Sequence, residues 1–126
     1  MLVTVDGTQG SVPREAGAWM AVFADTVVGT VGGGRLEFDA IAHARQMLPA
    51  AVLGAAAPQA RRYALGASLG QCCGGVVHLR FEAVSAVDLP ALRQRLLQHT
   101  RPVALFGGGH VGKALVRLLG TLPFDV

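Results

Sequence analysis

Residues 26–48 read TVVGTVGGGRLEFDAIAHARQML, and this stretch decides the class of fold. Its first part, residues 26–31, is apolar and β-branched, which is typical of a strand. Three consecutive glycines follow, and apolar residues then recur at helical spacing over 35–48, which predicts an amphipathic helix that ends at Pro49. A strand that enters a glycine turn and then a helix indicates an α/β fold.

Short predicted strands surround this segment. Residues 18–23 are apolar and pair with 26–31 as a predicted hairpin, and residues 2–5 form another short strand. Residues 61–65 read as a strand, and residues 76–82 alternate apolar and polar side chains, as in a half-buried strand. A helix with Asp88 as its N-cap follows. We therefore expect residues 1–100 to form a small mixed α+β domain.

Residues 101–126 carry a different pattern. Val103–Phe106 is a short apolar run that predicts a buried parallel strand. GGGHVG at 107–112 fits G-x-G-x-x-G, and the helical spacing of 111–119 follows it. This order of strand, glycine turn and helix predicts the opening of a Rossmann-type domain, which the chain leaves incomplete because the acidic ribose-binding position would fall after Val126.

The three motif glycines have separate steric roles in such a turn. Gly107 permits the tight turn, Gly109 lets the backbone approach a pyrophosphate, and Gly112 lets helix and strand pack closely. The helix N-terminus offers free N–H groups to the phosphate. In a chain with 17 glycines this motif by itself is weak support for nucleotide binding.

Composition excludes several classes of protein. Apolar residues make up 52% of the chain, the net charge is only +3, and no basic run or aromatic platform for nucleic acid is present. Apolar stretches are too short for a membrane span, and no signal peptide is visible. The two cysteines are adjacent, which does not suit a disulfide framework, so a reducing cytoplasm is the expected compartment.

Two glycine loops of residues 1–100 contain candidate binding residues. The turn before the helix presents Gly33 and Gly34 to an anion, with Arg14 and Arg35 as charge partners. The alternative is a plain tight turn with a solvated Arg35.

The second loop, LGQCCGG at 69–75, holds Gln71, Cys72, Cys73, Gly74 and Gly75. Its thiols are either small buried hydrophobes or soft ligands for a metal and for sulfur chemistry.

Four motifs occur in a fixed order: GSVPR at 10–14, GTVGGG at 29–34, LGQCCGGVV at 69–77 and LFGGGHVG at 105–112. Together they resemble the XdhC family, accessory proteins of xanthine dehydrogenase and related molybdenum hydroxylases. The resemblance implies a chaperone rather than an enzyme. Such a protein binds molybdenum cofactor (molybdopterin), protects it during sulfuration by a cysteine desulfurase, and inserts it into the apo xanthine dehydrogenase-type enzyme.

The resemblance also implies roles for residues. It makes Cys72 and Cys73 metal and cofactor contacts, and it supports Arg14 and Arg35 as binding residues. The remaining expected cofactor-binding residues come from the glycine loops: Gln71, Gly74, Gly75, Gly33, Gly34, Gly107, Gly109 and Gly112. The family pattern continues past both ends of the chain, so we expect a fragment of a longer protein. We also expect the chain to form a homo-oligomer. Alternatives are a fragment of an NAD(P)-dependent oxidoreductase and a non-functional truncated product.

Overall fold

The computed structural model describes residues 1–66, 73–97, 100–122 and 124–126. The chain divides into two compact units, Met1–Val84 and Ser85–Val126. Each unit is described by itself below. No helix in the described part of the chain is long and apolar enough to cross a membrane.

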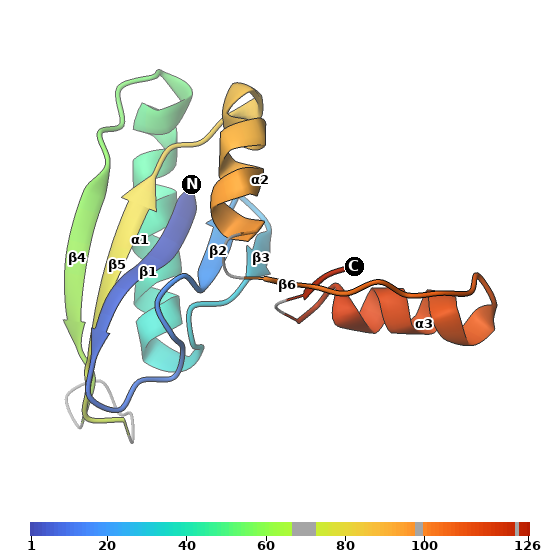
Figure 1. The fold of residues 1–126 in the computed structure, drawn as a ribbon. Helices are drawn as coiled ribbons and strands as arrows, with labels where there is room; N and C mark the ends of the chain where they lie inside the picture. The colour runs from blue at the N-terminus through green and yellow to red at the C-terminus, as the bar shows by residue number, and fades with distance from the viewer. Residues whose placement is uncertain (67–72, 98–99, 123) are drawn as a thin grey trace. The chain divides into compact units, whose positions relative to one another are not determined.

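The first unit is built on a five-stranded antiparallel sheet in the order β3-β2-β1-β5-β4 (Figure 1). Its strands are β1 (Leu2–Gln9), β2 (Trp19–Val22), β3 (Val27–Gly29), β4 (Gln59–Ala64) and β5 (Val76–Glu82). The predicted hairpin and the predicted strand 76–82 are both confirmed. β1 extends beyond the predicted residues 2–5, because a bulge between Val5 and Gly7 lets it stay paired with β5.

Helix α1 (Gly34–Val52) covers one face of this sheet (Figure 1). Its buried residues Leu36, Ala40, Ala44 and Met47 meet the strand residues that alternate toward them. The strand side of this core consists of Val3, Val5, Met20, Val22, Val77, Leu79 and Phe81. His43 of α1 also packs edge-on against Phe81, with ring centroids 4.8 Å apart.

The prediction that α1 ends at Pro49 is wrong, since the helix continues to Val52. Proline removes one backbone donor, and the last turn is held by other contacts. Met47 is buried there, Ala51 packs against the core, and the N–H of Leu53 bonds to the carbonyl of Pro49 at 3.4 Å. Packing against the core therefore outweighs the lost hydrogen bond.

The second unit contains a short 3-10 helix η2 (Ala86–Asp88), α2 (Leu89–Leu97), β6 (Arg101–Pro102), α3 (His110–Leu119) and β7 (Phe124–Asp125). The prediction of Asp88 as an N-cap is wrong, because Ser85 holds that position at the start of η2. The Asp88 carboxylate accepts hydrogen bonds from the Ser85 amide at 2.8 Å and from its hydroxyl at 2.9 Å. Ser85 and Asp88 thus form a capping box one turn earlier than the predicted cap.

β6 and β7 pair in parallel, and α3 connects them. The predicted helix is thus confirmed, whereas the predicted strand Val103–Phe106 is wrong: the pairing lies at Arg101–Pro102, and Phe106 is 96% exposed. β7 supplies two residues of pairing and one further bond, from the amide of Val103 to the carbonyl of Asp125 at 2.8 Å. An apolar run needs a longer neighbouring strand than this to become a buried strand. Residues 101–126 thus form a small β–α–β arrangement, and a Rossmann-type domain is not confirmed.

Candidate cofactor-binding site

Loops that carry three of the sequence motifs meet at the end of the sheet where β1 finishes (Figure 1). Gly75 is buried there, and its amide donates to the carbonyl of Ser11 at 3.0 Å. A side chain at Gly75 would overlap the carbonyl oxygens of Gln9 and Ser11. The end of the cysteine loop is therefore fixed directly against the loop that follows β1.

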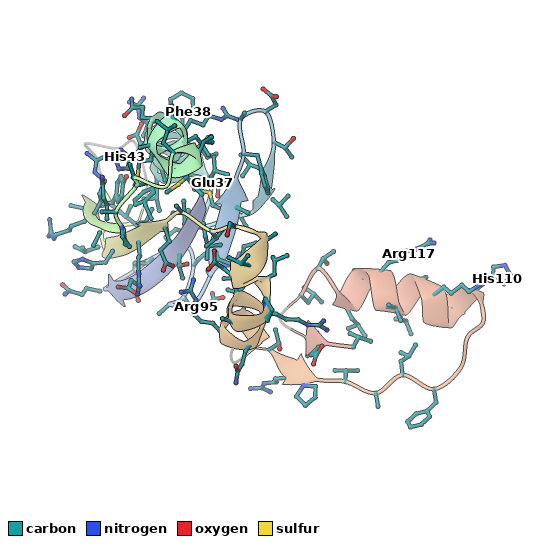
Figure 2. The ribbon with its side chains drawn as sticks, turned by 90° about the horizontal axis from the view of Figure 1, so that it is seen from above. Glu37, Phe38, His43, Arg95, His110 and Arg117 are labelled. Carbon is teal, nitrogen blue, oxygen red and sulfur yellow. The ribbon has the colours of Figure 1, made fainter. Side chains whose placement is uncertain are left out.

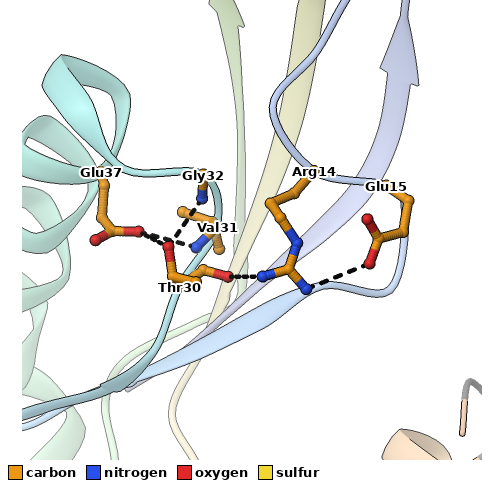
Figure 3. A network of polar contacts seen from close by, with 6 residues as sticks. All are labelled: Arg14, Glu15, Thr30, Val31, Gly32 and Glu37. Carbon is orange, nitrogen blue, oxygen red and sulfur yellow. Dashed lines mark hydrogen bonds and ion pairs between the residues drawn. The ribbon is translucent and has the colours of Figure 1, made fainter. Parts of the chain in front are cut away.

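A second close contact joins this loop to the turn before α1. Gly32 has a φ of +133°, and a Cβ on it would overlap the ring of Pro13. Arg14 reaches the same turn, because its Nη1 donates to the carbonyl of Thr30 at 3.4 Å (Figure 3). Segments 10–14, 29–34 and 73–75, far apart in the sequence, thus form one group of loops, which we call the loop cluster.

The turn before α1 is organised by the carboxylate of Glu37 (Figure 3). One oxygen of Glu37 accepts from the amide of Val31 at 3.0 Å, the amide of Gly33 at 3.1 Å and the hydroxyl of Thr30. The Thr30 hydroxyl in turn accepts from the amide of Gly32 at 3.1 Å. Of the two glycine amides that the sequence suggested for an external anion, that of Gly33 is thus bonded to an acidic residue of the same chain.

This network acts on the pKa of Glu37 in two directions. Partial burial raises it, but the bonds from Thr30 and from the backbone amides of Gly33, Val31 and Gly32 together lower it below its usual value. The sequence reasoning missed Glu37 and Thr30. An acidic residue in the first turn of a predicted helix was the available signal, because the helix N-terminus favours negative charge.

The two arginines of the prediction have different partners. Arg35 lies on α1, where its Nε is 2.9 Å from Oδ1 of Asp39 and its guanidinium stacks over Phe38 at 5.6 Å from the ring centroid. Arg14 lies in the loop cluster, 3.3 Å from Glu15, with its side chain 37% exposed. Figure 2 shows Phe38 and Glu37 projecting from α1 in different directions. Of the two arginines, Arg14 is the one whose guanidinium donates a hydrogen bond within the loop cluster, to the carbonyl of Thr30, whereas Arg35 pairs with Asp39 on α1.

Of the predicted thiols, Cys73 lies in the described part of the chain, whereas Gln71 and Cys72 lie outside it. Cys73 is a free cysteine, half-buried and packed against the core. Next to it, Gly74 is exposed and has open space where a side chain would stand. No three His, Cys, Asp or Glu side chains come together as a metal site among residues 1–66, 73–97, 100–122 and 124–126.

A comparison with protein families matches residues 1–63 to the XdhC and CoxI family, which is half of the chain. The chain belongs to this family. The match spans β1 to β4 almost completely and includes two of the motifs that form the loop cluster. No curated protein and no solved structure matches the chain. The family assignment indicates a role in the maturation of molybdenum enzymes, with accessory proteins rather than catalysts as its members.

The glycine turn before α3 lies outside the residues matched to the XdhC and CoxI family. Gly107 has a φ of +113°, which favours glycine, and a Cβ on Gly112 would overlap the carbonyl oxygen of Gly107. Gly109 is the N-cap of α3 and has open space around it. The positive φ of Gly107 agrees with the tight turn predicted there, whereas Gly112 lies against the carbonyl of Gly107 and not against a strand, because residues 103–106 form none. A ligand at this turn stays a prediction.

Proposed function

We propose that this chain binds molybdenum cofactor at the loop cluster and delivers it to a xanthine dehydrogenase-type enzyme after sulfuration by a cysteine desulfurase. The family assignment supports a role in maturation of such enzymes. The observation that carries the proposal is the contact of Gly75 with Gln9 and Ser11, since it fixes the end of the cysteine loop beside the loop of Arg14.

The residues of the loop cluster suit the chemistry of this cargo. A thiolate is a soft ligand for a metal–sulfur centre, and Cys73 is half-buried, which limits the access of water and oxidants. Arg14 offers a planar guanidinium for a phosphate, held by contacts of 3.3 and 3.4 Å that a stronger anion can replace. Gln71 and Cys72 belong to the same proposal on the ground of sequence alone.

Each residue has a distinct task in the proposed transfer. Arg14 orients the anionic end of the cargo, and the open space at Gly74 leaves the backbone accessible to it. The adjacent thiols contact the metal end and shield it until the acceptor enzyme takes it. The Glu37 network keeps the turn of residues 30–34 rigid, so the cluster is formed before the cargo arrives.

The proposal is tested with cofactor released anaerobically from a molybdenum enzyme and bound to the purified chain. Cys72 and Cys73 are each replaced by Ala and by Ser, and Arg14→Gln is compared with Arg45→Gln, an exposed arginine of α1. We expect Arg14→Gln to weaken binding about tenfold, as for one charge-assisted contact. The double cysteine variants should lose transfer to the apo-enzyme. Unchanged cofactor affinity and unchanged transfer in these variants would contradict the proposal that the loop cluster binds and delivers the cofactor.

A second candidate function is nucleotide binding at residues 107–112, as in an NAD(P)-dependent protein. The positive φ of Gly107 and the open space at Gly109 favour it, because both let backbone N–H groups approach a phosphate. Gly109→Val should then abolish binding of NAD(P) without affecting molybdenum cofactor. Formation of a homo-oligomer also remains a prediction, which sedimentation of the purified chain would test.

A further inference from the structure

The five-stranded sheet has two edge strands of unequal length (Figure 1). β3 has three residues and ends at Gly29, whose φ is +81°, so it offers little backbone for pairing. β4 has six residues and pairs with β5 in one continuous register without a bulge. Within residues 1–66 and 73–84, no strand pairs with the other side of β4. β4 is therefore the longer open edge of the sheet, and an open edge is where another chain can add a strand.

The hydrogen bonds between β4 and β5 alternate along the strand, and this alternation fixes which backbone groups face outward. The amide of Leu65, the residue that follows β4, donates to the carbonyl of Gly75 at 2.8 Å. Every second residue before Leu65 therefore bonds to β5, because hydrogen-bonded and non-hydrogen-bonded pairs alternate in an antiparallel ladder. The residues between them are exposed and direct their amides and carbonyls to the open edge: Ala60, Arg62 and Ala64.

Two adjacent arginines occupy the middle of this edge. Arg61 is the cross-strand partner of the core residue Leu79, so it lies on the α1 face of the sheet. Gln59 shares that face, and its Oε1 is 3.1 Å from Nε2 of His43 on α1. Arg62 comes next in the strand and therefore lies on the opposite face. Both arginines are exposed, and in the described part of the chain neither forms an ion pair with a carboxylate.

These arginines decide between a second copy of the chain and a different partner. Two copies of β4 related by a two-fold axis pair antiparallel, and the registers that pair most of the strand are centred on Arg61 or on Arg62. The central arginine then stands directly opposite its own copy, and like charges in that position are destabilising. A carboxylate in the same position is stabilising. The edge is therefore complementary to an acidic strand and not to itself.

We propose that β4 binds an extended segment of another protein that carries two consecutive acidic residues. The segment adds to the sheet as a sixth strand and bonds to the outward-facing backbone groups of Ala60, Arg62 and Ala64. Successive side chains of a strand point to opposite faces, so one carboxylate reaches Arg61 on the α1 face and the next reaches Arg62 on the other face. The segment lies beside the sheet and covers neither face. The proposal uses the sheet edge alone and does not rest on the proposed function.

Three capped peptides of equal length separate the contribution of charge from that of its placement. TVEEVT carries two consecutive glutamates, which point to opposite faces of a strand. TEVEVT has the same composition, but both of its glutamates point to one face. TVKKVT reverses the charge. Binding of each labelled peptide to the full chain is followed by fluorescence anisotropy.

Four variants of the chain complete the design. Arg61→Gln and Arg62→Gln each remove one charge of the edge, and Arg45→Gln removes an exposed arginine of α1 as the matched control. Ala60→Pro removes an outward-facing amide without removing a bond to β5, because proline is tolerated on an edge strand where its nitrogen faces solvent. Circular dichroism confirms that each variant is folded.

We expect saturable binding of TVEEVT, about threefold weaker binding of TEVEVT, and no binding of TVKKVT. Arg61→Gln and Arg62→Gln should each raise the Kd for TVEEVT about threefold, as for one cross-strand ion pair, while Arg45→Gln should leave it unchanged. Ala60→Pro should raise it at least about tenfold, since the added strand loses its backbone pairing. The charge-reversed chain Arg61→Glu/Arg62→Glu should bind TVKKVT in preference to TVEEVT.

Amide hydrogen exchange followed by NMR locates the bound strand. TVEEVT should slow the exchange of the amides of Arg62 and Ala64, whereas the amide of Tyr63 bonds to β5 with or without the peptide. Four results would each overturn the proposal. They are equal affinity for TVEEVT and TEVEVT, unchanged affinity in Ala60→Pro, no saturation up to about 1 mM TVEEVT, and protection of Arg62 and Ala64 that rises with the concentration of the chain alone. The last result would mean that a second copy occupies the edge.

Discussion

At the scale of single residues, Glu37 takes the place that a bound anion would occupy at the start of α1. Its carboxylate bonds to two backbone amides and to the Thr30 hydroxyl, so it joins the turn and the helix into one rigid piece. A buried or half-buried hydrogen-bond donor that loses such a partner is left unsatisfied. The free-energy cost of removing it from water is then no longer offset by a hydrogen bond.

Replacement of Glu37 by Gln should therefore destabilise the first unit by about 1–2 kcal/mol, because an amide oxygen is a weaker acceptor and the side chain is only partly buried. Urea unfolding at neutral pH measures this effect. Glu15→Gln is the matched control, since Glu15 is exposed and contacts only Arg14 outside its own backbone. A Glu37→Gln variant as stable as the Glu15→Gln variant would contradict the network's role.

The same contacts predict a pH dependence. Because folding lowers the pKa of Glu37 below its ordinary value of 4.5, its stabilisation is present at neutral pH and is lost as the pH falls through the folded-state pKa. The stability difference between the unmodified chain and Glu37→Gln should then shrink below pH 4.5. Urea unfolding of both proteins at a series of pH values, from about pH 7 down to about pH 3, tests this. A difference that stays constant over that interval would argue against the lowered pKa.

Gly75 and Gly74 offer a second matched pair. Gly75→Ala should destabilise the first unit by about 1–3 kcal/mol, because its methyl group would overlap the carbonyl oxygens of Gln9 and Ser11. Gly74→Ala should stay within about 0.5 kcal/mol, since nothing lies near its Cβ position. Thermal unfolding of the two variants gives the comparison, and equal losses would mean that the loops are not in close contact.

The sequence predicted the residue-scale features that depend on local sterics, and missed those that depend on distant partners. The role of Gly107 follows from a turn of known geometry, and its positive φ agrees with it. The contact of Gly75 with Ser11 joins residues more than sixty positions apart, and nothing in either motif specifies it.

At the scale of elements, periodicity predicted the helices and β5 well, and the ends of elements poorly. α1 passes through Pro49 because core packing holds its last turn, which no local rule foresees. Val103–Phe106 has the composition of a buried strand but pairs only through the amide of Val103. Burial depends on the neighbouring strand, so composition alone could not predict it.

α3 illustrates how little packing an element of the second unit has. Its apolar side chains Val111, Leu115, Leu118 are exposed, and none of its residues is buried. Figure 2 shows His110 and Arg117 together on one side of this helix, as its amphipathic pattern requires.

We therefore expect the amides of α3 to exchange with solvent much faster than those of β1 and β5, which lie inside the five-stranded sheet and flank its core. Hydrogen exchange followed by NMR or mass spectrometry on the dilute monomeric chain measures both sets at once. Protection of α3 equal to that of β5 would show that its apolar face is covered in solution.

At the scale of the whole molecule, the family match and the loop cluster lie in the same unit. Residues 1–63 belong to the XdhC and CoxI family, and residues 73–75 complete the cluster from the following segment. We therefore propose that Met1–Val84 contains the parts that recognise molybdenum cofactor. The glycine turn at 107–112 has its own geometry, and any nucleotide there would bind to a separate unit.

The most direct test of that claim is the cofactor content of the chain after anaerobic incubation with molybdenum cofactor and gel filtration. Molybdenum is measured by mass spectrometry, and the pterin by the fluorescence of its oxidised form. We predict that both elute with the chain in equimolar amounts, and that Cys72→Ser/Cys73→Ser abolishes this co-elution while circular dichroism shows the variant folded. Elution of the chain without molybdenum or pterin, or equal retention by the double variant, would contradict the account.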